Sequence, residues 1–148
     1  MGKDPYESGL LKKSPYVSKE TVFAKVVAIL DFASEERGLK LISQPSRAVR
    51  EGDVHELIIT SDKSASPGGC VNEVSYIAFV KVQNSGVILK NDVVKHNGKR
   101  MGTLAGFDET HMPNHQNILL YSPDRISSRQ LGIQLGDMIS FGMENENK

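Results

Sequence analysis

The sequence has few or none of several residue types that would point to particular functions. It contains one cysteine, Cys70, so no disulfide can form within the chain, and it has no tryptophan to stack on sugars or bases. Lys and Arg number 18, and so do Asp and Glu, so no net charge attracts nucleic acid or anionic membranes. Nowhere do about 18 apolar residues follow one another, as a membrane-spanning helix requires. We therefore expect neither nucleic acid nor a membrane as a partner.

The length of the chain and its first residues indicate the number of domains and the cellular compartment. A chain of 148 residues fits one domain and buries enough surface to fold without a disulfide or a metal. The first residues, MGKDPY, are polar and unlike a signal peptide. Together with the lone cysteine, this predicts a cytoplasmic protein.

Short segments rich in β-branched and aromatic residues predict about eight strands. A helix competes with the strand over residues 21–30, which also contain Ala, Lys and Leu. Residues 122–135 leave room for one helical turn at most, and long loops are expected over 61–72 and 106–116. The predicted strands are 21–30, 39–42, 54–60, 73–82, 92–95, 99–104, 117–121 and 137–141.

Turn residues separate these segments. Asn97-Gly98 is typical of a tight type I′ turn, so residues 92–104 are expected to form a hairpin. Three other strand entries share one pattern, in which Gly or Asn takes a left-handed backbone and the following Asp can bond to the backbone beyond it. These are Gly52-Asp53, Asn91-Asp92 and Gly136-Asp137.

The fold class that follows is all-β. We expect a small closed or partly open β-barrel of about eight short antiparallel strands, with a two-sheet sandwich as the second choice. Residues 1–20 are expected to form an extended arm, 21–142 the single domain and 143–148 a polar tail. The arm, together with exposed strand edges that need cover, predicts a homo-oligomer.

Five segments of residues 57–141 carry a resemblance to a known family. They are Ile59-Thr60-Ser61, YIAFVKV over 76–82, LKND over 89–92, GTLAG over 102–106 and Leu135-Gly136-Asp137. Through these segments the chain resembles the glucitol/sorbitol-specific IIA component of the sugar phosphotransferase system. The resemblance implies a small cytosolic β-barrel. That family phosphorylates a histidine on the strand matching residues 76–82, and this chain has none there. The resemblance thus supports the fold and argues against a phosphocarrier.

The segment 106–117 is the most concentrated polar stretch. It contains the candidate ligand-binding residues Asp108, Glu109, His111, Asn114 and His115. Imidazoles with a nearby carboxylate are donors for a divalent transition metal such as Zn²⁺, Fe²⁺ or Mn²⁺. The same side chains can instead cap turns, or bind a ligand without metal.

A third imidazole could complete that metal site. In a simple meander, loops alternate between the two ends of a barrel, so the link before Val54 and the loop 107–116 would share one end. His55 would then face His111 and His115, whereas a Greek-key crossing would break this arrangement. Cys70 would lie at the other end, and His96, in the hairpin turn, is expected to be exposed.

No assembled catalytic motif is present, such as Gly-x-Ser-x-Gly, Cys-x-x-Cys or His-Glu-x-x-His. We therefore expect a non-enzymatic binding or accessory protein for a small-molecule metabolite or a partner protein. The alternative is a metal-dependent enzyme centred on the loop 106–117.

Overall fold

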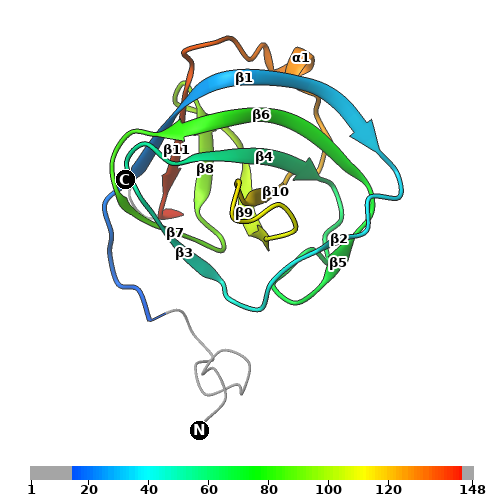
Figure 1. The fold of residues 1–148 in the computed structure, drawn as a ribbon, viewed down its shortest axis with the longest axis horizontal. Coiled ribbons are helices and arrows are strands. Elements are labelled where there is room, and N and C mark those ends of the chain that lie inside the picture. The colour runs from blue at the N-terminus through cyan, green and yellow to red at the C-terminus, as the bar shows by residue number, and fades with distance from the viewer. Residues whose placement is uncertain (1–14, 145–148) are drawn as a thin grey trace, which may run out of the picture.

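The computed structural model describes residues 15–144 and consists almost entirely of β-strands (Figure 1). The expected arm over 1–20 and tail over 143–148 lie mostly outside the described residues. Among these residues, the one helix, α1 (Ser128–Leu131), is far too short to cross a membrane. The strands are β1 (Val22–Ser34), β2 (Leu39–Lys40), β3 (Ser46–Val49), β4 (Val54–Thr60), β5 (Cys70–Val71), β6 (Val74–Val82), β7 (Gly86–Leu89), β8 (Val93–His96), β9 (Lys99–Asp108), β10 (Asn117–Tyr121) and β11 (Met138–Gly142).

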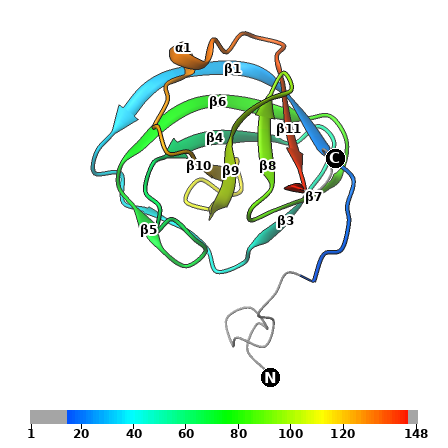
Figure 2. The same cartoon turned by 180° about the vertical axis from the view of Figure 1, so that it is seen from behind.

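Seven strands close into a ring in the order β1-β11-β8-β9-β10-β4-β6, with β6 hydrogen-bonded back to β1. The long curved strands β1, β6 and β4 lie side by side, and β9 and β8 are best seen from behind (Figure 2). Closing the ring leaves its strands without free edges. The all-β prediction is confirmed.

Two features of the topology differ from the sequence-based expectation. The ring order is not a simple meander, and β4 and β10 are parallel, whereas every other pair in the ring is antiparallel. Two short pairs, β2 with β5 and β3 with β7, lie outside the ring. The segments of β3 and β7 were not expected as strands, and β5 lies within the expected loop 61–72.

Apolar side chains form two clusters on the two faces of the strands. The larger one fills the ring and takes residues from all seven strands, including Leu57, Phe107 and Ile118. The smaller one includes Leu39, Ile58, Val71 and Leu119, and it packs the β2–β5 pair against the outside of β4 and β10. Strand alternation therefore gives β4 and β10 two buried faces, which explains why both read as nearly continuous apolar runs.

The turn predictions agree with the backbone. Asn97 and Gly98 both have positive φ, 49° and 87°, as the hairpin between β8 and β9 requires. Left-handed residues precede all three Asp strand entries, namely Gly52, Asn91 and Gly136. The carboxylates bond backwards rather than forwards: each accepts from the N–H three residues before it, in the pairs Asp53–Arg50, Asp92–Leu89 and Asp137–Gln134.

Candidate functional site

The parallel pairing of β4 with β10 places the starts of both strands at one end of the ring. Glu56 is the register partner of Asn117, and the backbone N–H of Glu56 donates to the carbonyl of Gln116 at 3.1 Å. The loop 109–116 leads into β10 at the same end. His55 is thus brought close to the candidate loop, although by parallel pairing rather than by a meander.

Alternation along the strands then separates the candidate residues onto two faces. Side chains two residues apart in a strand point to the same face. His55 therefore shares the face of Leu57, which belongs to the core inside the ring, and Glu56 shares the face of Ile58, which belongs to the outer cluster. Gln116 lies with His55, whereas Asn117 lies on the outer face with Glu56. The candidate residues therefore form an outer network and an inner cleft instead of one centre.

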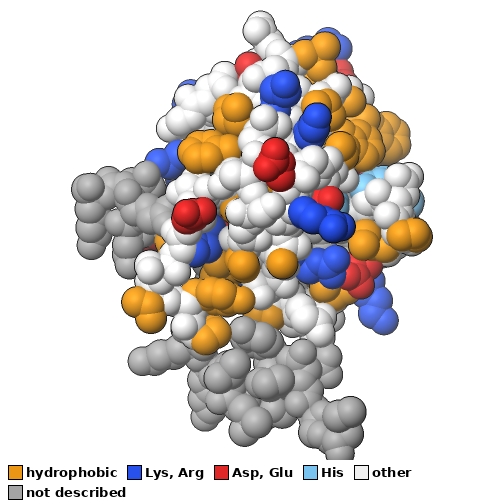
Figure 3. Space-filling view, turned by 60° about the vertical axis from the view of Figure 1, so that its left-hand side comes forward, with side chains coloured by type: hydrophobic (Ala, Val, Ile, Leu, Met, Phe, Trp, Pro, Cys, Tyr) orange, Lys and Arg blue, Asp and Glu red, His pale blue; other side chains and the backbone are white. Residues whose placement is uncertain are grey.

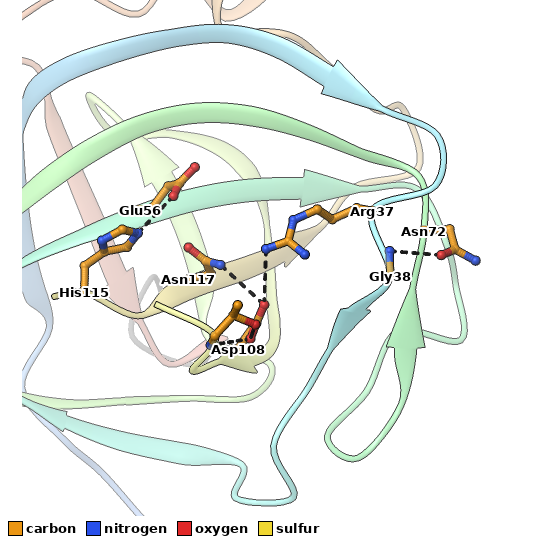
Figure 4. A network of polar contacts seen from close by, with 8 residues as sticks. Arg37, Gly38, Glu56, Asn72, Asp108, His115 and Asn117 are labelled. Atoms are coloured by element: carbon orange, nitrogen blue, oxygen red, sulfur yellow. Dashed lines mark hydrogen bonds and ion pairs between the residues drawn. The ribbon is translucent and has the colours of Figure 1, made fainter. Parts of the chain in front are cut away.

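The outer network joins His115 to Glu56 (Figure 4). The His115 Nε2 lies 3.2 Å from Glu56 Oε1, and both side chains are largely buried. The His111 ring stacks on His115 with centroids 5.1 Å apart, and the Phe79 ring meets His115 edge-on at 5.0 Å. The two imidazoles expected to share a metal are thus neighbours: they stack on each other, and Glu56 contacts His115.

Asp108 anchors the other half of the outer network. Its Oδ1 accepts bonds from the Thr110 N–H at 2.7 Å and the Thr110 hydroxyl at 2.6 Å, which caps the start of the loop. Its Oδ2 lies 3.4 Å from the Asn117 amide nitrogen and 3.8 Å from the Arg37 guanidinium. Asp108 is 2% exposed and belongs to β9, not to the loop where it was expected.

The other two candidate residues of the loop, Glu109 and Asn114, lie outside the outer network. Glu109 forms an ion pair with Arg47 of β3, and Asn114 lines the inner cleft. Across the described range 15–144, no three His, Cys, Asp or Glu side chains are placed to hold a metal ion together. The expected metal set of His55, His111 and His115 is not assembled, because His55 faces the inner side of β4.

The inner cleft opens between β3, the start of β4 and the loop that leads into β10. It has a volume of about 610 Å³. The polar side chains that line it include Arg47, Arg50, Asp53, His55, Ser85, Asn114 and Gln116.

Figure 3 shows one face of the molecule, on which basic and acidic side chains lie next to each other and neither sign forms a continuous patch.

His55 is held neutral in the wall of this cleft. Its Nδ1 accepts the backbone N–H of Gln116 at 3.2 Å, and its Nε2 lies 3.8 Å from Asp53 Oδ2. Burial lowers the pKa of His55 below 6.5, the Asp53 carboxylate opposes this, and the Arg47 and His115 side chains lower the pKa further. The neutral tautomer with its proton on Nε2 fits both contacts.

Gln116 is the least satisfied side chain at the cleft. It is 1% exposed, and its Oε1 is buried without a hydrogen-bond partner among the residues that the structure describes. A buried acceptor left without a donor costs about 1–3 kcal/mol. The same holds for Asn117 Oδ1 in the outer network. Bound water or a ligand is one physical explanation for such an atom.

Sequence analysis did not identify Arg47, Arg50, Glu56 or Gln116 as site residues. Arg47 lies in β3 and Arg50 directly follows it, in a segment that was interpreted as a polar link and whose residues, Ser-Arg-Ala-Val, show no alternation between polar and apolar. Glu56 lies in a strand that was predicted correctly and Gln116 directly precedes another, but their position at the site depends on a strand pairing that no local pattern gives. Only the pairing of β4 with β10 could have identified them.

The two other candidate residues lie away from this end. Cys70 is exposed and lines a separate hollow with Ser61 and Asp62, which follow the far end of β4. His96 is not an exposed turn residue, contrary to expectation. It ends β8 and its Nε2 lies 2.6 Å from Asp137 Oδ2, so it ties the hairpin to the entry of β11.

Comparison with known proteins gives a family match. A family model described as a family of unknown function (DUF6917) matches residues 16–142. No curated protein and no solved structure matches the chain.

Proposed function

The chain belongs to the family of unknown function DUF6917, and we propose from its own residues that it is a non-enzymatic binding protein. It takes a small polar molecule into the inner cleft. The observation that carries this proposal is the buried Gln116 amide oxygen, which has no donor within the described part of the chain and belongs to a residue lining that cleft. The cleft's volume, about 610 Å³, falls within the usual range for small-molecule sites.

The rest of the lining supports binding rather than catalysis. His55 is neutral, its Nδ1 is occupied by a backbone N–H, and its Nε2 faces Asp53. A general base needs a free nitrogen lone pair that reaches the substrate, and His55 offers none in this arrangement. Asn114 and Ser85 can both donate and accept hydrogen bonds, which suits recognition of a polar ligand.

A cleft-filling variant tests the proposal. Ala48 lies in β3, is exposed and lines the cleft, so Ala48→Trp places an indole in the binding space. Ala33→Trp is the matched control, because Ala33 is also an exposed strand alanine but lies near the end of β1, outside the cleft. The experiment is a screen of a metabolite library by NMR, following the backbone amides.

We expect at least one compound to shift the amide signals of His55, Asn114 and Gln116. Ala48→Trp abolishes these shifts and Ala33→Trp preserves them. A library that leaves all three amides unmoved, or shifts that persist in Ala48→Trp, would contradict the proposal.

We also propose that the protein is cytoplasmic and forms a homo-oligomer. The free thiol of Cys70 fits a reducing compartment. Support for self-association comes from β1, where Phe23, Val27, Ile29 and Phe32 are each exposed by 41% or more. Analytical ultracentrifugation at tens of micromolar is the test, and Phe32→Ser is expected to shift the protein towards monomer. A wild type that sediments only as monomer would refute the oligomer.

A further inference from the structure

The lining of the inner cleft includes one arginine that can pair with an anionic ligand. Among the lining residues, Arg47 and Arg50 are cationic and Asp53 is the single carboxylate. Arg47 already pairs with Glu109, whereas the side chain of Arg50 forms no ion pair within residues 15–144. Asp53 accepts the backbone N–H of Arg50 and its Oδ2 lies 3.8 Å from His55 Nε2, and within residues 15–144 no ion pair joins it to the Arg50 guanidinium. One guanidinium therefore remains available to a ligand.

The Gln116 amide indicates a second property of the ligand, a hydrogen-bond donor. Its oxygen has no donor, and the atom itself is buried. The terminal torsion of a glutamine side chain is soft, so the amide can turn and present its oxygen to the cleft. A ligand hydroxyl or amino group then supplies the missing donor. A purely anionic ligand would leave this acceptor unsatisfied.

We propose that the cleft binds a small organic anion that also carries a hydroxyl or amino group. The carboxylate or phosphate pairs with the planar fork of Arg50, and the hydroxyl or amino group donates to Gln116 Oε1. This inference rests on the proposed binding function and specifies its ligand class. The guanidinium fork fits carboxylate and phosphate alike, so the test includes both.

Two pairs of compounds separate the two contacts. Malate and succinate are both dicarboxylates and differ by one hydroxyl, which tests the donor to Gln116. Glycerol 3-phosphate and glycerol differ by the anionic group, which tests Arg50. Binding of each is measured by NMR titration to the wild type, Arg50→Gln, Gln116→Met and Arg100→Gln. Arg100 is an exposed arginine of β9 that does not line the inner cleft, so Arg100→Gln is the charge-matched control.

We expect wild-type protein to bind malate about tenfold more tightly than succinate, the value of one hydrogen bond to an otherwise unpaired acceptor. Arg50→Gln weakens malate, succinate and glycerol 3-phosphate by about tenfold or more, because it removes the charge partner. Gln116→Met removes the preference for malate over succinate and leaves succinate binding unchanged. Arg100→Gln changes nothing.

Three results would overturn the inference. The first is equal affinity for malate and succinate in the wild type. The second is an Arg50→Gln variant that binds all anions as well as the wild type, and the third is equal weakening by Arg100→Gln, which would indicate general surface charge. Gln116 is buried, so its variant could lose stability; the wild-type comparison and the exposed Arg50 decide the question without it.

The outcome also distinguishes this inference from the proposed function. Neutral compounds that bind in the cleft, are blocked by Ala48→Trp and are unaffected by Arg50→Gln would support a binding protein and refute an anionic ligand. A failure of every library compound to bind the cleft would refute both.

Discussion

The backbone N–H of Gln116 donates to Nδ1 of His55 across 3.2 Å, and this bond joins the loop before β10 to the start of β4. An imidazole nitrogen can accept this bond only while it carries no proton. The position of the loop at the inner cleft is therefore coupled to the neutral state of His55.

The first prediction concerns pH. Because the pKa of His55 is lowered in the folded protein, the unfolded chain takes up a proton below pH 6.5 while the folded protein does not. Stability is therefore expected to decrease as the pH falls below 6.5, until the pH reaches the folded pKa. His55→Asn keeps an acceptor near the Nδ1 position and cannot titrate. Urea unfolding at pH 7.5 and 5.0 is expected to show a smaller loss in this variant.

Other titratable groups also change the stability of the wild type with pH. The comparison therefore uses the difference between the wild type and His55→Asn. The charges of Asp53, Arg47 and His115 also act on the pKa of His55, and all three residues remain in the variant. An NMR titration that places the pKa of His55 above 6.5, or equal losses of stability in both proteins, would refute the prediction.

The second prediction concerns a buried ion pair that holds the segment before β1. The Lys19 ammonium lies 3.2 Å from Asp92 Oδ2 and donates to the carbonyl of Phe141 at 3.0 Å; its side chain is 7% exposed and that of Asp92 is 1% exposed. Removing one partner leaves a buried charge uncompensated, so Asp92→Asn and Lys19→Met are each expected to cost about 3 kcal/mol of unfolding free energy.

A double-mutant cycle checks this prediction. Lys19→Met with Asp92→Asn together should cost less than the sum of the two single changes. The pair Arg129–Asp31 is the control, because its side chains are 83% and 51% exposed, and Arg129→Gln should cost under about 0.5 kcal/mol. Additive costs for Lys19 and Asp92 would show that the pair has no coupling.

A third prediction uses two glycines of β9. A Cβ at Gly102 would lie 2.6 Å from the carbonyl oxygen of Tyr121, a backbone atom of the paired strand β10. A Cβ at Gly106 would lie 3.1 Å from Leu41 Cδ1, the end of a flexible side chain. Gly102→Ala is therefore expected to lower the unfolding free energy by about 1–3 kcal/mol, and Gly106→Ala by clearly less. Equal effects in chemical denaturation would contradict the difference.

Local sequence signals were sufficient for most of the ring strands and for the tight turn. The β-branched run at 54–60 and the Asn97-Gly98 turn each determine their own conformation through short-range sterics, and both were predicted correctly. The short strands β3 and β7 were missed because they are stabilised mainly by pairing with each other. Four residues are too few to give a periodic signal that can be recognised.

The candidate site was only partly predictable for a related reason. The loop over 106–117 was identified from its polar residues, and His111 and His115 do lie together. Which side chains face the cleft depends on the parallel register of β4 and β10, and a shift of one residue would exchange His55 for Glu56. That register is set by packing on both faces of the strands, which a single sequence does not reveal.

The last prediction addresses the metal alternative. A transition-metal site with two imidazoles needs at least one more donor with open geometry. The His115 Nε2 already contacts Glu56, and His55 faces the other side of β4 with its Nδ1 occupied by the Gln116 N–H. Adding Zn²⁺, Mn²⁺ or Fe²⁺ to protein purified without an affinity tag is therefore expected to leave the thermal midpoint unchanged. Elemental analysis of the same protein is expected to show less than one metal per chain. Stoichiometric metal that is lost in both His111→Ala and His115→Ala would favour the enzyme instead, because only a shared ligand role makes both histidines necessary.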